Sequence, residues 1–171
     1  SRAIMFTFSR GAYLGIIARK TGALFEWCGA TLSELSRLPH AGADPPRLGS
    51  AAGMLLQMVD DIHDYTLSDE VAGKERGKDL GAGRLTLPAI LALNDPAARP
   101  EFLALWEGSR DGAVSALDMA RFLESCGAMS GARARCQELV SSIKTWAAAL
   151  PVKGPARELC DFMDVMSRRE F

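Results

Sequence analysis

Apolar residues recur every three or four positions along most of the chain, a spacing that places them on one face of an α-helix. No stretch alternates apolar and polar residues over enough positions to predict a β-strand. The pattern is clearest in one segment near the C-terminus. Its apolar face is formed by Cys136, Leu139, Val140, Ile143, Trp146, Ala147 and Leu150. The sequence therefore predicts an all-α fold.

Turn-forming residues divide this pattern into separate helices. We expect one long helix, or two short ones bent near Gly22, over residues 7–38, and then a loop at 39–44. Asp44-Pro45-Pro46 predicts a helix start, because Asp caps free backbone N–H groups and Pro fits the first turn. That helix should run to about Tyr65, and the glycine-rich, charged residues 66–84 should form a long polar loop. Further helices are expected over residues 85–93, 98–107, 112–125, 131–150 and 155–169.

Two of these predicted helices make specific claims about burial. In the last helix, Leu159, Phe162, Met163 and Met166 should share one buried face. Between residues 48 and 59 the apolar side chains cover nearly every direction around the helix axis, which is typical of a helix at the centre of a structure. The helices predicted in this chain would surround such a helix only poorly, so we expect it to need further packing partners.

Composition narrows the class of protein. A length of 171 residues suits one domain, and 20 basic against 21 acidic residues give no reason to expect nucleic acid or an anionic membrane as the main partner. No apolar run reaches the roughly 18 residues that a membrane-spanning helix needs, so we expect no transmembrane segment. The four cysteines form no C-x-x-C pair, which favours reduced thiols and a cytoplasmic location.

The predicted central helix ends in the acidic run Asp60-Asp61-Ile62-His63-Asp64. At 3.6 residues per turn, Asp60 and Asp64 stack one turn apart, and Gln57 lies one turn before Asp60 and Asp61. Carboxylates held this close repel one another, so a bound cation would stabilise them. Oxygen ligands of this kind suit Mg²⁺ together with a diphosphate. A solvated acidic helix end is the alternative that the spacing leaves open.

Cations occur close to this motif in the sequence. The glycine- and lysine-rich residues 73–80 include Lys74 and could close over a bound anion, although such a loop is more often a flexible surface segment. Lys20-Thr21 lies inside the apolar helical stretch 13–25. Lys20 therefore either extends to solvent along its aliphatic stem or reaches an internal anion.

Three motifs in series resemble the C-terminal part of the polyprenyl synthetase family, the trans-isoprenyl diphosphate synthases. Residues 13–24, with Lys20-Thr21-Gly22, are similar to the family's lysine-threonine helix. Residues 53–64, with Gln57 before the aspartates, resemble its second aspartate-rich motif, and residues 73–88 resemble the loop that follows. The resemblance covers roughly residues 13–91 and implies the C-terminal part of an isoprenoid-synthase-type helical bundle.

The resemblance also implies a chemistry, in which isopentenyl diphosphate condenses with an allylic diphosphate after Mg²⁺-assisted ionisation of the allylic C–O bond. By analogy, Asp60 and Asp64 hold one Mg²⁺ with Asp61 in support. Lys20 and Lys74 bind the allylic diphosphate. In the same comparison, Thr21 and Gln57 lie beside the reacting carbons, and the basic pair Arg168-Arg169 lies near isopentenyl diphosphate.

The sequence departs from the family pattern in what it lacks. The family's first aspartate-rich motif lies upstream of the lysine-threonine helix and has no counterpart in residues 1–171. The family's basic residues that bind isopentenyl diphosphate are also missing from residues 1–171. We therefore expect residues 1–171 to be the C-terminal portion of one synthase domain, inactive alone, whose partner is a second copy in a homodimer, a missing N-terminal half, or both. A non-catalytic partner subunit of a heteromeric synthase and a terpene cyclase of the same fold are the alternatives.

Overall fold

The computed structural model describes residues 9–36, 44–66, 79, 82–110 and 112–168. Throughout these residues the regular secondary structure is helical, which confirms the predicted all-α fold. The elements are α1 (Arg10–Ile17), the π-helical turn η1 (Ala18–Gly22), α2 (Ala23–Ser36), α3 (Pro45–Thr66), α6 (Leu87–Asn94), α7 (Arg99–Arg110), α8 (Ala116–Ser125), α9 (Ala128–Ala147) and α10 (Lys153–Arg168). None of these helices is both long and apolar enough to cross a bilayer.

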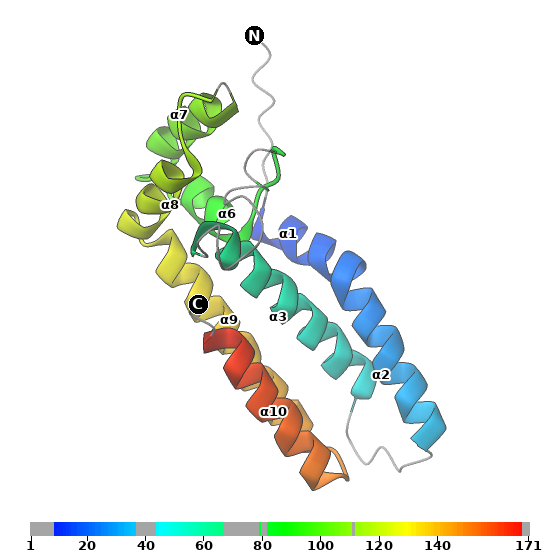
Figure 1. The fold of residues 1–171 in the computed structure, drawn as a ribbon. Coiled ribbons are helices and arrows are strands. Elements are labelled where there is room, and N and C mark those ends of the chain that lie inside the picture. Colours follow the sequence, from blue (N-terminus) through cyan, green and yellow to red (C-terminus); the bar gives the residue numbers. More distant parts are fainter. Residues whose placement is uncertain (1–8, 37–43, 67–78, 80–81, 111, 169–171) are drawn as a thin grey trace.

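The first three elements form one continuous helical run (Figure 1). Ser9 caps it, because its hydroxyl oxygen accepts a hydrogen bond from the backbone N–H of Ala12 at 3.1 Å. The expected interruption near Gly22 takes the form of the π-helical turn, whose last residue is Gly22. The run therefore matches the long helix predicted for this region, with a local widening in its middle.

Helix α3 lies between α2 on one side and α9 and α10 on the other (Figure 1). The backbone N–H of Arg47 donates to the carboxylate of Asp44 at 3.1 Å, which confirms the predicted helix start. The apolar residues buried within 48–59 are Leu48, Ala51, Ala52, Leu55, Met58 and Val59. Leu56 remains 38% exposed. This chain thus covers most of α3 by itself, contrary to the expectation of poor cover, because α9 and α10 pack against the face opposite α2.

Glycines allow α2 and η1 to lie very close to α3. A Cβ atom at Gly49 would lie 2.1 Å from the carbonyl oxygen of Phe25, and one at Gly53 would lie 2.8 Å from the carbonyl oxygen of Thr21. Neither distance can accommodate a side chain, since both contacts are with backbone atoms. The absence of a side chain at Gly53 lets the backbone of Thr21 lie against the helix that carries the aspartates.

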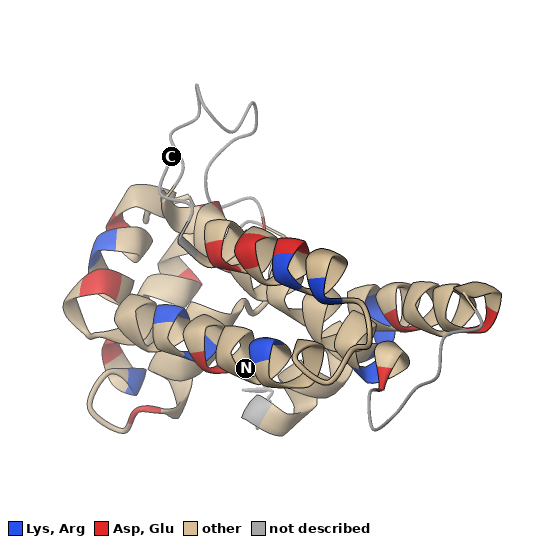
Figure 2. Ribbon diagram, turned by 90° about the horizontal axis from the view of Figure 1, so that it is seen from below, with Lys and Arg blue, Asp and Glu red and all other residues tan. Residues whose placement is uncertain are grey.

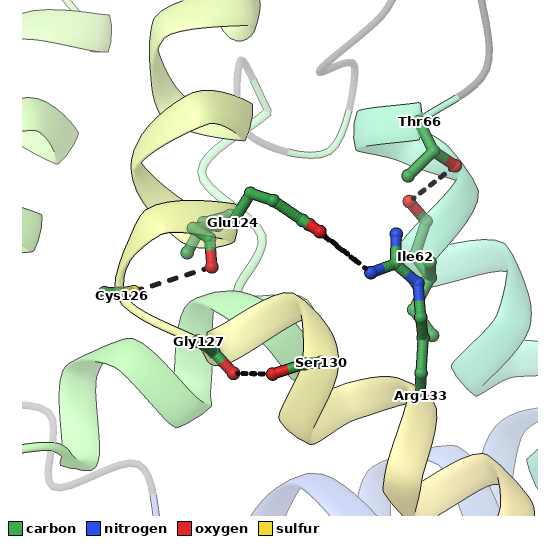
Figure 3. Close-up of polar contacts among 8 residues, drawn as sticks. Ile62, Thr66, Glu124, Cys126, Gly127, Ser130 and Arg133 are labelled. Atoms are coloured by element: carbon green, nitrogen blue, oxygen red, sulfur yellow. Dashed lines mark hydrogen bonds and ion pairs between the residues drawn. The ribbon is translucent and has the colours of Figure 1, made fainter.

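Helices α6, α7 and α8 gather at the end of the molecule where α3 finishes (Figure 1). Helix α8 begins at Ala116 instead of residue 112, because Ser115 and Asp118 form a reciprocal capping box. Helix α9 begins at Ala128, directly after Gly127, which has a φ of 79°. Figure 3 shows the ion pair that joins α8 to α9, between Arg133 and Glu124 at 3.1 Å, and, within the first turn of α9, the Ser130 hydroxyl that donates to the Gly127 carbonyl at 2.9 Å.

The buried face of α10 differs from the predicted one. Phe162 is 54% exposed, so its predicted place on the buried face of the last helix is wrong. The buried stripe of α10 instead runs through Ala156, Met163 and Met166, and Phe162 lies outside it. The predicted polar loop at 66–84 and the loop at 39–44 fall almost wholly outside the described residues.

Candidate active site

Two of the three aspartates lie on an accessible face at the C-terminal end of α3. Asp60 is exposed and has no hydrogen-bond or ion-pair partner within the described residues. Asp64 is half-buried, and its Oδ2 accepts a hydrogen bond from the backbone N–H of Asp79 at 3.2 Å. The Asp79 carboxylate in turn pairs with Arg84 at 2.8 Å. Asp60 and Asp64 lie one turn apart on α3, as the spacing predicted. The hydrogen bond from Asp79 joins this end of α3 to the chain that follows.

Asp61 occupies a different environment. Its side chain points into the interior, the residue is 4% exposed, and three donors reach it. Oδ2 accepts from the Tyr13 hydroxyl at 2.7 Å and from the Leu87 backbone N–H at 2.8 Å, and Oδ1 accepts from Nε2 of Gln57 at 3.0 Å. Burial raises the pKa of Asp61, and the hydrogen bonds from Tyr13, Gln57 and Leu87 oppose that rise. Asp61 thereby links α1, α3 and α6.

The lysine-threonine motif lies directly beside these groups. The Thr21 hydroxyl donates to Oε1 of Gln57 at 3.1 Å, so Thr21, Gln57 and Asp61 form an unbroken row of hydrogen bonds. Lys20, the residue before Thr21, is exposed. The structure thus brings together four residues that the sequence singled out: Lys20, Thr21, Gln57 and Asp61.

The π-helical turn positions Thr21. A π turn inserts an extra residue relative to an α-helix, and such turns are frequent at functional sites. Gly22 ends the turn and is buried against Ser50 of α3, since an added Cβ would lie 3.2 Å from the Ser50 hydroxyl. Nothing in the local sequence predicts a π turn here apart from the glycine itself.

Sequence reasoning missed several contributors to this site. Tyr13 belongs to the lysine-threonine pattern, but the sequence analysis gave it no role. Its polar hydroxyl in an apolar helix, two turns before Lys20, was the signal that could have identified it. The N–H of Leu87 reaches Asp61 across 26 positions of sequence, and no local pattern marks such a contact. Nearby, the hydroxyls of Tyr65 and Thr86 lie 2.8 Å apart in the interior at the start of α6.

Three predicted site residues cannot be placed. Lys74 and Arg169 lie outside the described residues, and Arg168 is the last residue of α10, with no description of its side chain. Their assignment to diphosphate binding stays a prediction.

The residues present fit a partial Mg²⁺ site. Within the described part of the chain, no three His, Cys, Asp or Glu side chains converge as a cation cage. Mg²⁺ usually takes only one or two protein carboxylates and fills its remaining positions with water and substrate phosphate. Asp60 and Asp64 match that donor set. Asp61 fits less well, since its buried carboxylate already accepts hydrogen bonds from three donors.

Comparison with known proteins agrees with the fold. The profile of the polyprenyl synthetase family matches residues 3–121, and the chain belongs to this family. It is 30% identical over 162 residues to the geranylgeranyl diphosphate synthase of Mycobacterium tuberculosis (strain ATCC 25618 / H37Rv). It is 39% identical over 99 residues to heptaprenyl diphosphate synthase component 2 of Geobacillus stearothermophilus.

The match spans only part of these proteins. It covers 92% of this chain but 45% of the mycobacterial relative, and 54% of this chain but 29% of the Geobacillus relative. The crystal structure of geranylgeranyl pyrophosphate synthase from Bacteroides thetaiotaomicron superposes with a TM-score of 0.76 at 26% identity, over 95% of this chain and 55% of that one. The chain therefore has the fold of about half of such a synthase, which confirms the predicted isoprenoid-synthase-type bundle.

Proposed function

We propose that this chain is the C-terminal half of a trans-prenyltransferase that condenses isopentenyl diphosphate with an allylic diphosphate. The observation that carries the proposal is the grouping at the end of α3. The accessible carboxylates Asp60 and Asp64 continue the helix that bears Gln57, and Gln57 is hydrogen-bonded to Thr21 beside the exposed Lys20. The carboxylates of Asp60 and Asp64 suit a divalent cation paired with an anion. The oxygens of Gln57 and Thr21 suit a carbocation.

Each residue has a distinct part in this reaction. Asp60 and Asp64 would hold one Mg²⁺, which would supply positive charge to neutralise the allylic diphosphate. Lys20 and Lys74 bind the same diphosphate, and Arg168 and Arg169 bind isopentenyl diphosphate. The oxygens of Thr21 and Gln57 stabilise the positive charge that remains on the allylic carbons.

The complete synthase needs a first half, either on the same polypeptide or on another subunit. That half supplies the first aspartate-rich motif, for which residues 1–171 contain no candidate. A specific observation favours a second candidate function, that of one subunit of a heteromeric synthase: the Geobacillus relative is named as a component of its enzyme. The accessible pair Asp60 and Asp64 favours a catalytic half over a purely supporting one.

Metal binding tests the proposal. In the complete synthase, Asp60→Ala and Asp64→Ala should each weaken Mg²⁺–diphosphate binding at least tenfold, because each removes one of the two accessible carboxylates. Asp161→Ala, which removes an exposed carboxylate on α10, is the matched control and should bind normally. The measurement is titration calorimetry with inorganic diphosphate in the presence and absence of Mg²⁺. Unchanged binding in both variants would refute the metal site.

A further inference from the structure

One carboxylate of the aspartate motif, that of Asp61, is buried and already accepts hydrogen bonds from three donors. We propose that Asp61 is a positioning residue that fixes the orientation of Gln57 and Thr21, and that it is not a ligand of the metal. This inference rests on the proposed function, because it assigns roles within the same site. It replaces the supporting metal role that the sequence resemblance gave to Asp61.

The surroundings of Asp61 carry the first step. A carboxylate can only accept hydrogen bonds, and here its donors come from three different elements: Tyr13 of α1, Gln57 of α3 and Leu87 of α6. With only 4% of the residue exposed, a metal ion could reach Asp61 only by displacing one of these donors and opening the contact between helices. Asp60, by contrast, is exposed, and Asp64 is half-buried.

The second step is that Asp61 sets the direction of the groups beyond it. Because the carboxylate accepts only, Gln57 must turn its NH₂ group toward Oδ1, at 3.0 Å, and its carbonyl oxygen away. The carbonyl oxygen then receives the Thr21 hydroxyl hydrogen at 3.1 Å. The Thr21 hydroxyl has only one hydrogen, so its lone pairs point away from Gln57. The orientation of each group follows from that of the group before it.

This row of dipoles has a chemical consequence. The oxygen of the Gln57 amide is turned away from Asp61 and toward Thr21, and the lone pairs of the Thr21 hydroxyl are turned away from Gln57. Hydrogen-bond donors and acceptors held in place before the reaction stabilise developing charge without reorganising. The fixed oxygens of Gln57 and Thr21 therefore suit a cation that forms beside a departing diphosphate. If Gln57 turned round, it would present its NH₂ group instead and oppose that charge.

Tyr13 and Leu87 fix the orientation of the Asp61 carboxylate itself. Both donate to Oδ2, at 2.7 Å and 2.8 Å, which leaves Oδ1 for Gln57. The Leu87 bond comes from the first turn of α6, and the Tyr13 bond comes from the helix that continues into η1. The same carboxylate thus fixes the helix that carries Lys20 and Thr21 and the helix that carries Gln57.

The decisive variant is Asp61→Asn, which keeps the shape of the side chain but offers an NH₂ group to which the Gln57 oxygen can turn. In the complete synthase we expect kcat to fall at least tenfold, with the KM for the allylic diphosphate and the affinity for Mg²⁺–diphosphate each changed less than twofold. Asp60→Asn should do the opposite and lose Mg²⁺–diphosphate affinity. If Asp61→Asn weakens metal binding as much as Asp60→Asn, Asp61 is a ligand and the proposal is wrong.

A second readout needs no substrate. The side-chain NH₂ resonances of Gln57 in a ¹⁵N-edited NMR spectrum report which group that amide faces, and they should shift in Asp61→Asn. Tyr13→Phe, which removes only one hydroxyl, should shift these resonances less. It replaces Asp61→Asn in this measurement if Asp61→Asn does not fold. Resonances that stay in place in both variants would overturn the proposal. If even the unsubstituted synthase binds no Mg²⁺–diphosphate, the proposed function fails, and the NMR result alone decides the role of Asp61.

Discussion

At the scale of single residues, the interior around Asp61 keeps its titratable neighbours protonated. No buried side-chain nitrogen or oxygen lacks a hydrogen-bond partner within the described part of the chain. Burial raises the pKa of the Tyr13 hydroxyl, and the negative charge of Asp61 raises it further. Burial likewise raises the pKa of the Tyr65 hydroxyl, and it raises the pKa of the Cys136 thiol to about 12. Deprotonating any of these groups would place a second negative charge near Asp61.

The Cys136 thiol predicts a loss of stability in alkaline solution. Burial raises its pKa from 9.0 to about 12 on folding. The contribution of the protonated thiol to the free energy of unfolding is therefore fully present below pH 9 and is lost as the pH rises toward 12. One pKa unit corresponds to about 1.4 kcal/mol. Cys136→Ala should lower the melting temperature at pH 7, because it leaves a small cavity, and should flatten its fall between pH 9 and 11. Cys126→Ala, at a half-buried cysteine, should keep the original slope. Parallel slopes for all three proteins would contradict the assignment.

At the scale of elements, local chemistry predicted most helices, and packing determined what it missed. Asp44 before two prolines correctly predicted the start of α3. The start of α8 was predicted too early, at residue 112, although the Ser115–Asp118 capping box that begins it is a local sequence signal. The π turn was not, because it depends on the approach of Thr21 to α3. The helical spacing correctly stacked Asp60 over Asp64. It could not distinguish the buried Asp61, whose partner Tyr13 lies 48 positions away.

The approach of α2 to α3 gives a prediction at this scale. Gly49→Ala would place a Cβ atom 2.1 Å from the Phe25 carbonyl oxygen, so the two helices must separate. Overpacking of this kind costs about 1–3 kcal/mol, which should lower the melting temperature by roughly 2–12 °C in a chain of this size. Gly154→Ala is the control, since an added Cβ there meets nothing within 4 Å and alanine favours a helix. Equal melting temperatures for the two variants would show that the close approach is not required.

At the scale of the whole molecule, the two outer helices differ in character. Helix α10 carries basic residues near its start, at Lys153 and Arg157, followed by the acidic residues Glu158, Asp161 and Asp164, whereas α2 has charges only at Glu26 and Glu34 (Figure 2). The exposed residues of α2 include the large apolar side chains Leu24, Trp27, Leu32 and Leu35. In a helix these four positions lie on one side, so they form a continuous apolar stripe. An exposed stripe of this kind is typical of a surface that another structure covers.

The last prediction follows from this stripe. Residues 1–171 expressed alone should self-associate in a concentration-dependent way and should lack prenyltransferase activity. Each buried apolar side chain in such a contact contributes about 1.5–3 kcal/mol, so several of them outweigh the loss of one chain's freedom. Replacing Leu24, Trp27 and Leu32 together with Gln should reduce association in sedimentation velocity. Leu103→Gln, at a 40% exposed leucine of α7, is the control and should not reduce association.

Adding the first half of the synthase should compete with self-association and restore condensation of labelled isopentenyl diphosphate. A monomeric chain that makes prenyl diphosphate unaided would show instead that the site in α3 and η1 is sufficient and that the stripe belongs on the surface.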